Sequence, residues 1–230
     1  MINNNLKLKK MIVKSLIFAS IASLSLAFMT PPKDANASQT GNIQTPMTQP
    51  KKTEVATLAG GCFWKMDASY QQLKGVTKVE VGYAGGTKVN PTYEDVNTRT
   101  TGHAETVQVT FDPAIISYHD ILEVYWEIHD ATVLNQEGND RGNDYRSAVF
   151  YRSESQKKEA ETMLASLNKT LKYNRPLVTA IEPFKNFYVA EKYHQNYYNL
   201  HPNEPYTKNV VRKKVEHFEQ VFKNKLKSHS

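Results

Sequence analysis

The order of hydrophobic patterns between residues 55 and 151 restricts the fold of this chain more than any other sequence feature. Short apolar or alternating runs predict strands, because successive side chains of a strand point to opposite faces. Four such runs occur, at residues 55–59, 77–83, 105–111 and 147–151. Helix-spaced apolar residues follow the first and third runs, which gives the order β-α-β-β-α-β. This order is typical of an α+β fold with a ferredoxin-like split βαβ core.

The expected helices carry their own start and stop signals. The first, at 62–73, is expected to end at Gly75 as a C′ glycine. Ser117 with Asp120 predicts a cap for the second helix, and Ser153 with Gln156 predicts a capping box for a third. The expected buried faces are Ile121, Leu122, Tyr125 and Ile128 in the second helix, and Ala160, Met163, Leu164, Leu167 and Leu171 in the third.

The remaining segments are less regular. They are read as long polar loops at 84–103 and 129–146, a fifth strand at 177–181, a short aromatic helix at 187–198 and a basic terminal helix at 208–227. Loops as long as these in a compact domain are usually functional or disordered.

The N-terminus predicts an export signal. A basic stretch with four lysines precedes the uncharged, mostly apolar run 15–29, and Ala35-Asn36-Ala37 matches a cleavage pattern. The run is too short for a typical membrane span, so we expect cleavage near Ala37 and no stable membrane insertion afterwards. The mature protein is then expected to be periplasmic or secreted, with a disordered linker at 38–54 and a single domain at 55–230.

The net charge of +6 mostly reflects this N-terminal segment. Residues 1–37 carry five Lys and one Asp, which leaves 24 basic and 22 acidic residues in the remainder. A domain whose basic and acidic residues are nearly equal in number gives no argument for nucleic-acid binding. We expect the protein to be a monomer. The seven histidines are dispersed without metal-ligand spacing, so no metal is expected. His103 and His194 are expected to hydrogen-bond within the fold.

Cysteine occurs once, at Cys62, where the first strand meets the first helix. A helix N-terminus favours the thiolate, which is the reactive form of sulfur. Gly60 and Gly61 permit a tight turn and a close approach of another molecule. Phe63 and Trp64 could belong to the core or wall an apolar pocket. The residues alone leave open whether Cys62 is a buried small hydrophobe or a nucleophile.

Other candidate groups lie near strand ends and in the long loops. Glu105 opens the third strand, and burial there would raise its pKa enough for general-acid catalysis. Tyr93 lies in the first loop, and Asp140 and Tyr145 lie in the second. A thiolate, a carboxylic acid and two phenols together would suit the reduction of a sulfur–oxygen bond.

Seven ordered motifs make the chain resemble the peptide-methionine (S)-S-oxide reductases over about residues 55–222. They are residues 61–64 (GCFW), 82–86 (GYAGG), 91–96 (PTYEDV), 101–105 (TGHAE), 138–142 (GNDRG), 144–148 (DYRSA) and 190–197 (AEKYHQNY). The resemblance implies the two-layer α+β roll of that family. The resemblance also implies that the substrates are oxidised proteins or peptides that bear methionine-S-sulfoxide, and that no cofactor is bound.

The resemblance also implies a role for each candidate residue. Cys62 matches the nucleophile, and Glu105 matches the acid that protonates the sulfoxide oxygen. Phe63 and Trp64 match the cage that holds the substrate's S-methyl group. In the same way, Tyr93 and Tyr145 match the tyrosines that bind the oxygen, and Asp140 matches the active-site aspartate.

The chain departs from the family where a second cysteine is common. Asn97 and Thr207 occupy those positions, Lys65 stands where Gly is frequent, and Arg99 and Thr100 replace a usual Gly-Arg pair. We therefore expect an external thiol, either thioredoxin-like, glutaredoxin-like or small, to reduce the Cys62 sulfenic acid. A thiol peroxidase and a non-catalytic binder of oxidised methionine remain as alternatives.

Overall fold

The computed structural model describes residues 52–170 and 172–228. The chain divides into two units, residues 1–47 and 48–230, and the described residues belong to the second. The expected export signal at 1–37 and most of the expected linker lie outside the described residues. The linker was expected to extend to residue 54, but Glu54 already belongs to the first strand.

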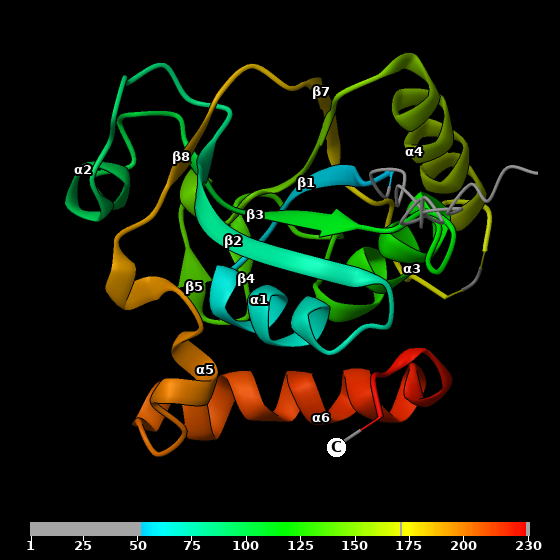
Figure 1. Cartoon of the computed structure of the whole chain (residues 1–230). Coiled ribbons are helices and arrows are strands. Elements are labelled where there is room, and N and C mark those ends of the chain that lie inside the picture. The colour runs from blue at the N-terminus through cyan, green and yellow to red at the C-terminus, as the bar shows by residue number, and fades with distance from the viewer. Residues whose placement is uncertain (1–51, 171, 229–230) are drawn as a thin grey trace, which may run out of the picture. The chain divides into compact units, whose positions relative to one another are not determined.

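Strands and helices alternate along most of the described chain (Figure 1). In order they are β1 (Glu54–Gly60), α1 (Phe63–Gln71), β2 (Val76–Ala84), α2 (Tyr93–Asn97), β3 (Ala104–Phe111), α3 (Tyr118–Ile128), β4 (Gln136–Glu137), β5 (Asp140–Arg141), β6 (Ser147–Tyr151), α4 (Glu154–Leu167), β7 (Ala180–Pro183), β8 (Phe187–Val189), α5 (Tyr197–Leu200) and α6 (Arg212–Val221). Short 3-10 turns cover Asn143–Tyr145, Lys192–His194 and Lys223–Lys225, and a π-helical turn covers Thr207–Val211.

One mixed sheet holds six of the strands, in the order β7-β6-β1-β3-β2-β8. The strand β1 lies between β3 and β6 and is antiparallel to both, while β2 is antiparallel to β3 and β8. Only β6 and β7 pair in parallel within this sheet. The four strands expected from the sequence are thus neighbours, and a mixed sheet with helices gives an α+β fold.

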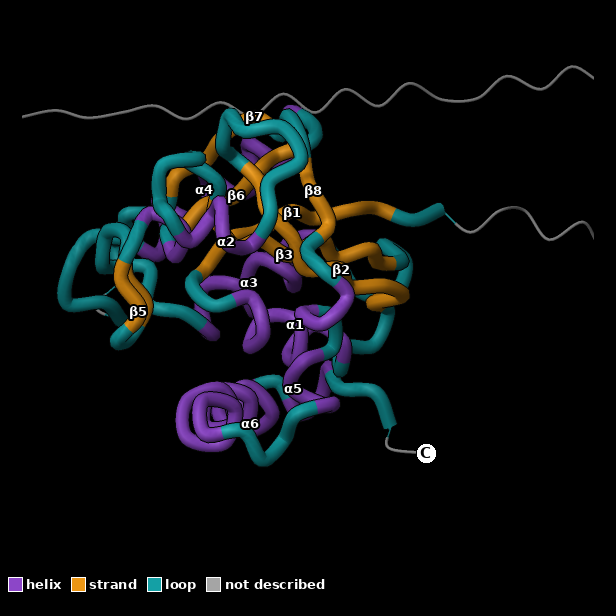
Figure 2. The backbone as a smooth tube through the Cα atoms, turned by 90° about the vertical axis from the view of Figure 1, so that its left-hand side faces the viewer, coloured by secondary structure: helices purple, strands orange, loops and turns teal. Residues whose placement is uncertain are grey.

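Helices α1 and α3 lie next to the sheet, and α6 lies beyond them (Figure 2). The core forms where the sheet meets α1 and α3, with Leu58, Met66, Val107 and Ile121 fully buried. Burying each such side chain contributes roughly 1.5–3 kcal/mol. The expected cap of α3 is present as a complete capping box between Ser117 and Asp120.

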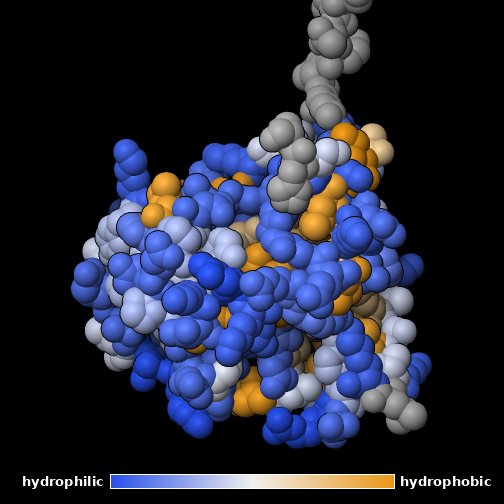
Figure 3. Space-filling model, turned by 90° about the horizontal axis from the view of Figure 1, so that it is seen from below, coloured by the Kyte–Doolittle hydropathy of each residue, from blue (hydrophilic) through white to orange (hydrophobic). Residues whose placement is uncertain are grey.

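The face seen from below in Figure 3 is mainly hydrophilic, with scattered hydrophobic patches. The helix α6 buries Val215 and Phe218 while Lys213 and Lys214 remain exposed, so its basic residues form a solvated face. In the part of the chain that the structure describes, no helix has the length and apolar character needed to cross a membrane.

Several local expectations are wrong in detail. The helix α1 ends at Gln71, so Gly75 is not its C′ residue. Instead Gly75 has φ +84° in the turn before β2, where a Cβ would lie 2.7 Å from Ile116. Gln156 completes only half of the expected box, because its side chain accepts from the amide of Arg152 rather than from that of Ser153.

The segments read as loops contain more structure than their polarity indicated. The first loop contains α2, which Thr92 and Asp95 cap, and the second contains β4 and β5. The expected aromatic helix at 187–198 is divided into β8, a 3-10 turn and α5. The fifth strand is β7, shifted toward Pro183, and the terminal helix includes a π-helical turn. Leu171 lies outside the described residues.

Candidate active site

Cys62 is the N-cap of α1, directly after the end of β1. The preceding Gly61 has φ +74°, and a Cβ there would lie 2.4 Å from the side chain of Glu137. A glycine is therefore required on both conformational and steric grounds. Within this chain, the side chain of Glu137 makes the close approach to Gly61.

A pocket of about 160 Å³ opens at Cys62 and contains all seven residues expected at the site. Phe63 and Trp64 come from α1, and Glu105 comes from β3. Tyr93 begins α2, Asp140 begins β5 and Tyr145 ends the 3-10 turn before β6. The lining is Cys62, Phe63, Trp64, Tyr93, Glu105, Asp140, Tyr145 and Tyr206. Residues from across 145 positions of sequence therefore converge on one sulfur atom.

Glu105 is a buried carboxyl group whose side chain is only 4% exposed. Its Oε2 accepts a hydrogen bond from the amide of Phe63 at 3.0 Å, which fixes it beside the Cys62 turn. Burial raises the pKa of Glu105 to about 8, the Phe63 amide opposes this, and the charges of Asp144 and Asp140 add to it. The side chain is therefore protonated at neutral pH and can donate a proton.

The thiol of Cys62 is not activated in the way that its helix position indicated. Burial raises its pKa far above the usual value, and the charge of Glu105 adds to the rise. The backbone amide of Trp64, the side chain of Tyr206 and the charge of Lys65 each lower the pKa, but they do not reverse the rise. Desolvation outweighs the helix N-terminus because Cys62 is only 7% exposed and the charged form loses most of its water. The resting state is therefore a thiol.

The aromatic wall of the pocket is held from behind by further rings. Trp64 stacks on Tyr197 with a centroid separation of 3.8 Å and an interplanar angle of 6°. Phe63 lies 5.1 Å from the ring of His194 and 6.2 Å from that of Tyr83. These contacts fix the orientation of both rings, so they can form one rigid apolar side of the cavity.

Phenol groups supply the hydrogen-bond donors of the pocket. Burial followed by the charge of Glu105 raises the pKa of Tyr93 to about 12 and raises that of Tyr145 still further. Both phenols therefore stay protonated and can donate to an oxygen atom. The backbone of Tyr93 is anchored by a 2.9 Å hydrogen bond from its amide to Glu191.

Tyr206 is a lining residue that sequence reasoning missed. Its hydroxyl donates to Oδ2 of Asp140, which links the segment before the π-helical turn to β5. The sequence contains a signal for this residue, because Tyr206 directly precedes Thr207, which occupies a position where a second cysteine is common in the family.

The two histidines behave differently. His103 accepts from the amide of Gly86 at Nδ1, and its Nε2 lies 2.8 Å from the carbonyl oxygen of Lys88, as expected for a histidine that bonds within the fold. His194 is 2% exposed, and neither ring nitrogen has a hydrogen-bond partner among the residues that the structure describes, which contradicts the expectation for it. It packs instead among the rings of Phe63, Trp64 and Tyr93. Within residues 52–170 and 172–228, no group of three or more His, Cys, Asp or Glu side chains could hold a metal ion.

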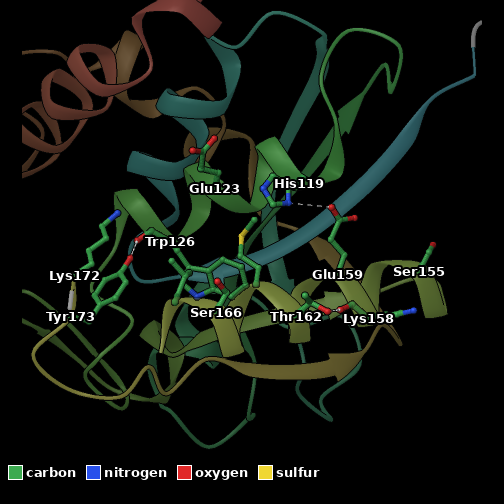
Figure 4. Close-up of a pocket in the computed structure, with 12 residues that line it drawn as sticks. His119, Glu123, Trp126, Ser155, Lys158, Glu159, Thr162, Ser166, Lys172 and Tyr173 are labelled. Atoms are coloured by element: carbon green, nitrogen blue, oxygen red, sulfur yellow. Dashed lines mark hydrogen bonds and ion pairs between the residues drawn. The ribbon is translucent and has the colours of Figure 1, made fainter. Parts of the chain in front are cut away.

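A larger groove of about 720 Å³ lies between α3 and α4, and Figure 4 shows its lining. Across this groove, Nδ1 of His119 lies 3.5 Å from Oε1 of Glu159. Glu123, which also lines the groove, is exposed to solvent. None of its lining residues borders the Cys62 pocket, and it contains no sulfur nucleophile. The chemistry that the sequence indicated therefore lies in the smaller pocket.

Comparison with known proteins shows which family the chain resembles along its length. Residues 54–226 match the family model of peptide methionine sulfoxide reductases. The chain is 51% identical to peptide methionine sulfoxide reductase MsrA of Saccharolobus solfataricus over 176 residues, which covers 76% of this chain and 98% of the relative. With the MsrA of Deinococcus radiodurans it is 47% identical over 193 residues, covering 84% and 94% of the two chains.

Solved structures show the same likeness. Reduced Mxr1 from Saccharomyces cerevisiae superposes with a TM-score of 0.63 at 34% identity, covering 67% of this chain and 89% of that chain. Methionine sulfoxide reductase A of Corynebacterium diphtheriae also gives a TM-score of 0.63, at 31% identity, covering 67% and 77%. These similarities favour neither of the alternatives, the thiol peroxidase or the non-catalytic binder.

Proposed function

The chain belongs to the peptide methionine sulfoxide reductase family, and from this premise we propose how its pocket reduces the sulfoxide. It is an oxidoreductase, a peptide-methionine (S)-S-oxide reductase. The observation that carries the proposal is a sole cysteine and a protonated, buried Glu105 bordering one aromatic-walled pocket.

In the first step the sulfur of Cys62 attacks the sulfoxide sulfur while Glu105 protonates the sulfoxide oxygen. The carboxylate of Glu105 then takes up the proton that the thiol gives up, so no net proton is consumed. The substrate's sulfur–oxygen bond breaks, the oxygen is transferred to Cys62 as a sulfenic acid, and methionine leaves. A fixed acid in a desolvated pocket lowers the barrier because little reorganisation is needed as charge develops.

The other lining residues orient the substrate. Phe63 and Trp64 hold the S-methyl group against the rigid apolar wall. Tyr93 and Tyr145, both protonated, donate hydrogen bonds to the sulfoxide oxygen. Asp140, bonded to Tyr206, anchors the polar side of the pocket. This assignment places the oxygen at the acid and phenols and the methyl at the aromatic wall, which selects one sulfoxide epimer.

Regeneration requires an external thiol, because the sequence contains one cysteine. The first thiol condenses with the sulfenic acid, forming a mixed disulfide and water. A second thiolate attacks the external sulfur of that disulfide, and Cys62 is released in its reduced form. The reductant is a thioredoxin-like protein, a glutaredoxin-like protein or a small thiol.

The test compares the two epimers of methionine sulfoxide with a dithiol reagent present. We expect multiple turnovers of the S epimer, none of the R epimer, and no turnover by Cys62→Ser. Equal use of both epimers, or activity that survives Cys62→Ser, contradicts the assignment. Intact mass after one turnover, with a monothiol, a dithiol or thioredoxin added in turn, identifies as the reductant the thiol that returns the protein to its reduced mass without a persisting sulfenic acid or mixed disulfide.

We also propose how the chain is processed and assembled. The segment 1–37 directs export and is cleaved near Ala37, which leaves a periplasmic or secreted monomer with a linker up to residue 53. The order β6-β1-β3-β2, with antiparallel neighbours, supports a ferredoxin-like split βαβ core within the roll. Intact mass and light scattering of protein recovered from the producing cells test cleavage and oligomeric state.

A further inference from the structure

A second, smaller cavity of about 40 Å³ also borders Cys62. Lys65, Glu137 and Lys214 line it, and none of these three lines the 160 Å³ pocket. Val210 and Val211 supply apolar surface on its C-terminal side. The Cys62 sulfur therefore borders two cavities. Glu105 and the tyrosines line the larger cavity, and charged residues without a role in the proposed reaction line the smaller one.

Lys65 and Glu137 form a buried ion pair in this second space. Their exposed fractions are 3% and 6%, and the ammonium of Lys65 bonds Oε1 of Glu137. Oε2 of Glu137 accepts from the amide of Asp130 at 2.8 Å. Glu137 also packs against Gly61, the residue before Cys62. The bonds to both carboxylate oxygens and the contact with Gly61 therefore fix the ion pair relative to the Cys62 turn.

Such a pair needs a reason beyond stability. Well-packed apolar residues often replace a buried ion pair at no cost, because desolvation offsets most of the Coulomb attraction. A charge held in a desolvated interior acts on its neighbours more strongly than one at the surface. The neighbour here is the reactive thiol.

We propose that Lys65, positioned by Glu137, stabilises negative charge on the Cys62 sulfur. The sulfur gains such charge as it loses its proton during attack, and again when it leaves a mixed disulfide as a thiolate. These two steps rest on the proposed function. The interaction between the ammonium and the sulfur exists without substrate and can be measured without turnover.

The charges around the sulfur are consistent in sign with this role. Burial and then Glu105 raise the pKa of Cys62, whereas Lys65 lowers it, and Lys65 also lowers the pKa of Glu105. Near neutral pH Glu105 is protonated, so its opposing charge is largely absent. The titratable groups that face the sulfur or the pair are Glu105, Asp140, Glu137, Lys65, Lys214, His129, Tyr93, Tyr145 and Tyr206.

The experiment measures the rate at which iodoacetamide alkylates the full-length protein across pH, without substrate. The sole cysteine makes the signal specific to Cys62. For Lys65→Met we expect about a tenfold lower rate at pH 8, equivalent to one pH unit in the thiol's titration. The matched control is Lys172→Met, which removes a lysine–glutamate pair with Glu127 away from the sulfur and should leave the rate unchanged.

The double variant Lys65→Met with Glu137→Leu separates charge from folding. It replaces the ion pair by an apolar pair and should fold even where the single variant does not, while alkylating more slowly than the wild type because the Lys65 ammonium is absent. Alkylation at the wild-type rate by the folded double variant overturns the proposal. Absence of sulfoxide turnover in the wild-type protein, with the difference in alkylation between the variants still present, would instead count against the proposed function, so the two failures are distinguishable.

Discussion

Glu105 and Glu137 are both buried beside the Cys62 turn, yet their surroundings drive their ionisation in opposite directions. Burial raises the pKa of Glu105 to about 8, and the Phe63 amide only partly opposes it. Burial would also raise the pKa of Glu137, but the charge and hydrogen bond of Lys65, together with the charges of His129 and Lys214, outweigh burial and bring the pKa below the usual value. An unpaired buried carboxyl is a proton donor, and a paired one is a fixed anion.

Removing the carboxyl of Glu105 should give the largest effect. Glu105→Gln keeps the size of the side chain but has no proton to donate, so single-turnover reduction should slow by about 10²–10⁴-fold. Rapid-quench measurement of methionine formation checks this. The matched Gln72→Glu variant changes an amide at the C-cap of α1, outside the pocket, and should react at the wild-type rate. A loss below tenfold in Glu105→Gln would assign proton donation to another group.

Removing the carboxylate of Glu137 should mainly cost stability. Glu137→Leu leaves the Lys65 ammonium buried without its partner, which we expect to destabilise the fold by about 3–5 kcal/mol. Urea unfolding followed by circular dichroism measures the change. The double variant Lys65→Met with Glu137→Leu should recover most of the loss. Equal destabilisation in the single and double variants would show that packing, not the unpaired charge, is responsible.

The same contrast predicts a pH dependence of stability. Because the folded pKa of Glu105 is about 8 and its ordinary value is 4.5, the folded state binds the extra proton between these values. Stability from this group is therefore complete below about pH 4.5 and falls by about 1.4 kcal/mol per pH unit up to pH 8. Subtracting the urea-unfolding curve of Glu105→Gln isolates the slope. A flat difference would place Glu105 in its charged form.

The exposed partner of Glu137 should matter least. Lys214 lies 3.6 Å from Oε1 of Glu137, but its side chain is 47% exposed. Solvent screens this contact, so Lys214→Met should change the free energy of unfolding by less than about 1 kcal/mol. The same urea titration tests it. A larger change would show that Lys214, and not Lys65 alone, holds Glu137 in its ionised form.

Local pattern was a sound guide wherever a few neighbouring residues decide the structure. The strands β1, β2, β3 and β6 and the cap of α3 follow from alternation and from hydrogen bonds that span three residues. It was a poor guide between residues 187 and 198, where β8 forms only because β2 offers a partner edge. Aromatic residues there indicated burial correctly but could not distinguish a strand from a helix.

The sequence by itself determined which groups are available to this enzyme. One cysteine after two glycines, a carboxyl at a strand mouth and phenols in two loops were all visible, together with the need for an external thiol. The tertiary structure alone decided their protonation, because burial and partners depend on contacts between distant segments. Lys65 meets Glu137 across 72 positions, and Tyr206 meets Asp140 across 66. The sequence therefore predicts Cys62 as the nucleophile through its family motifs, whereas a resting thiol follows only from the fold.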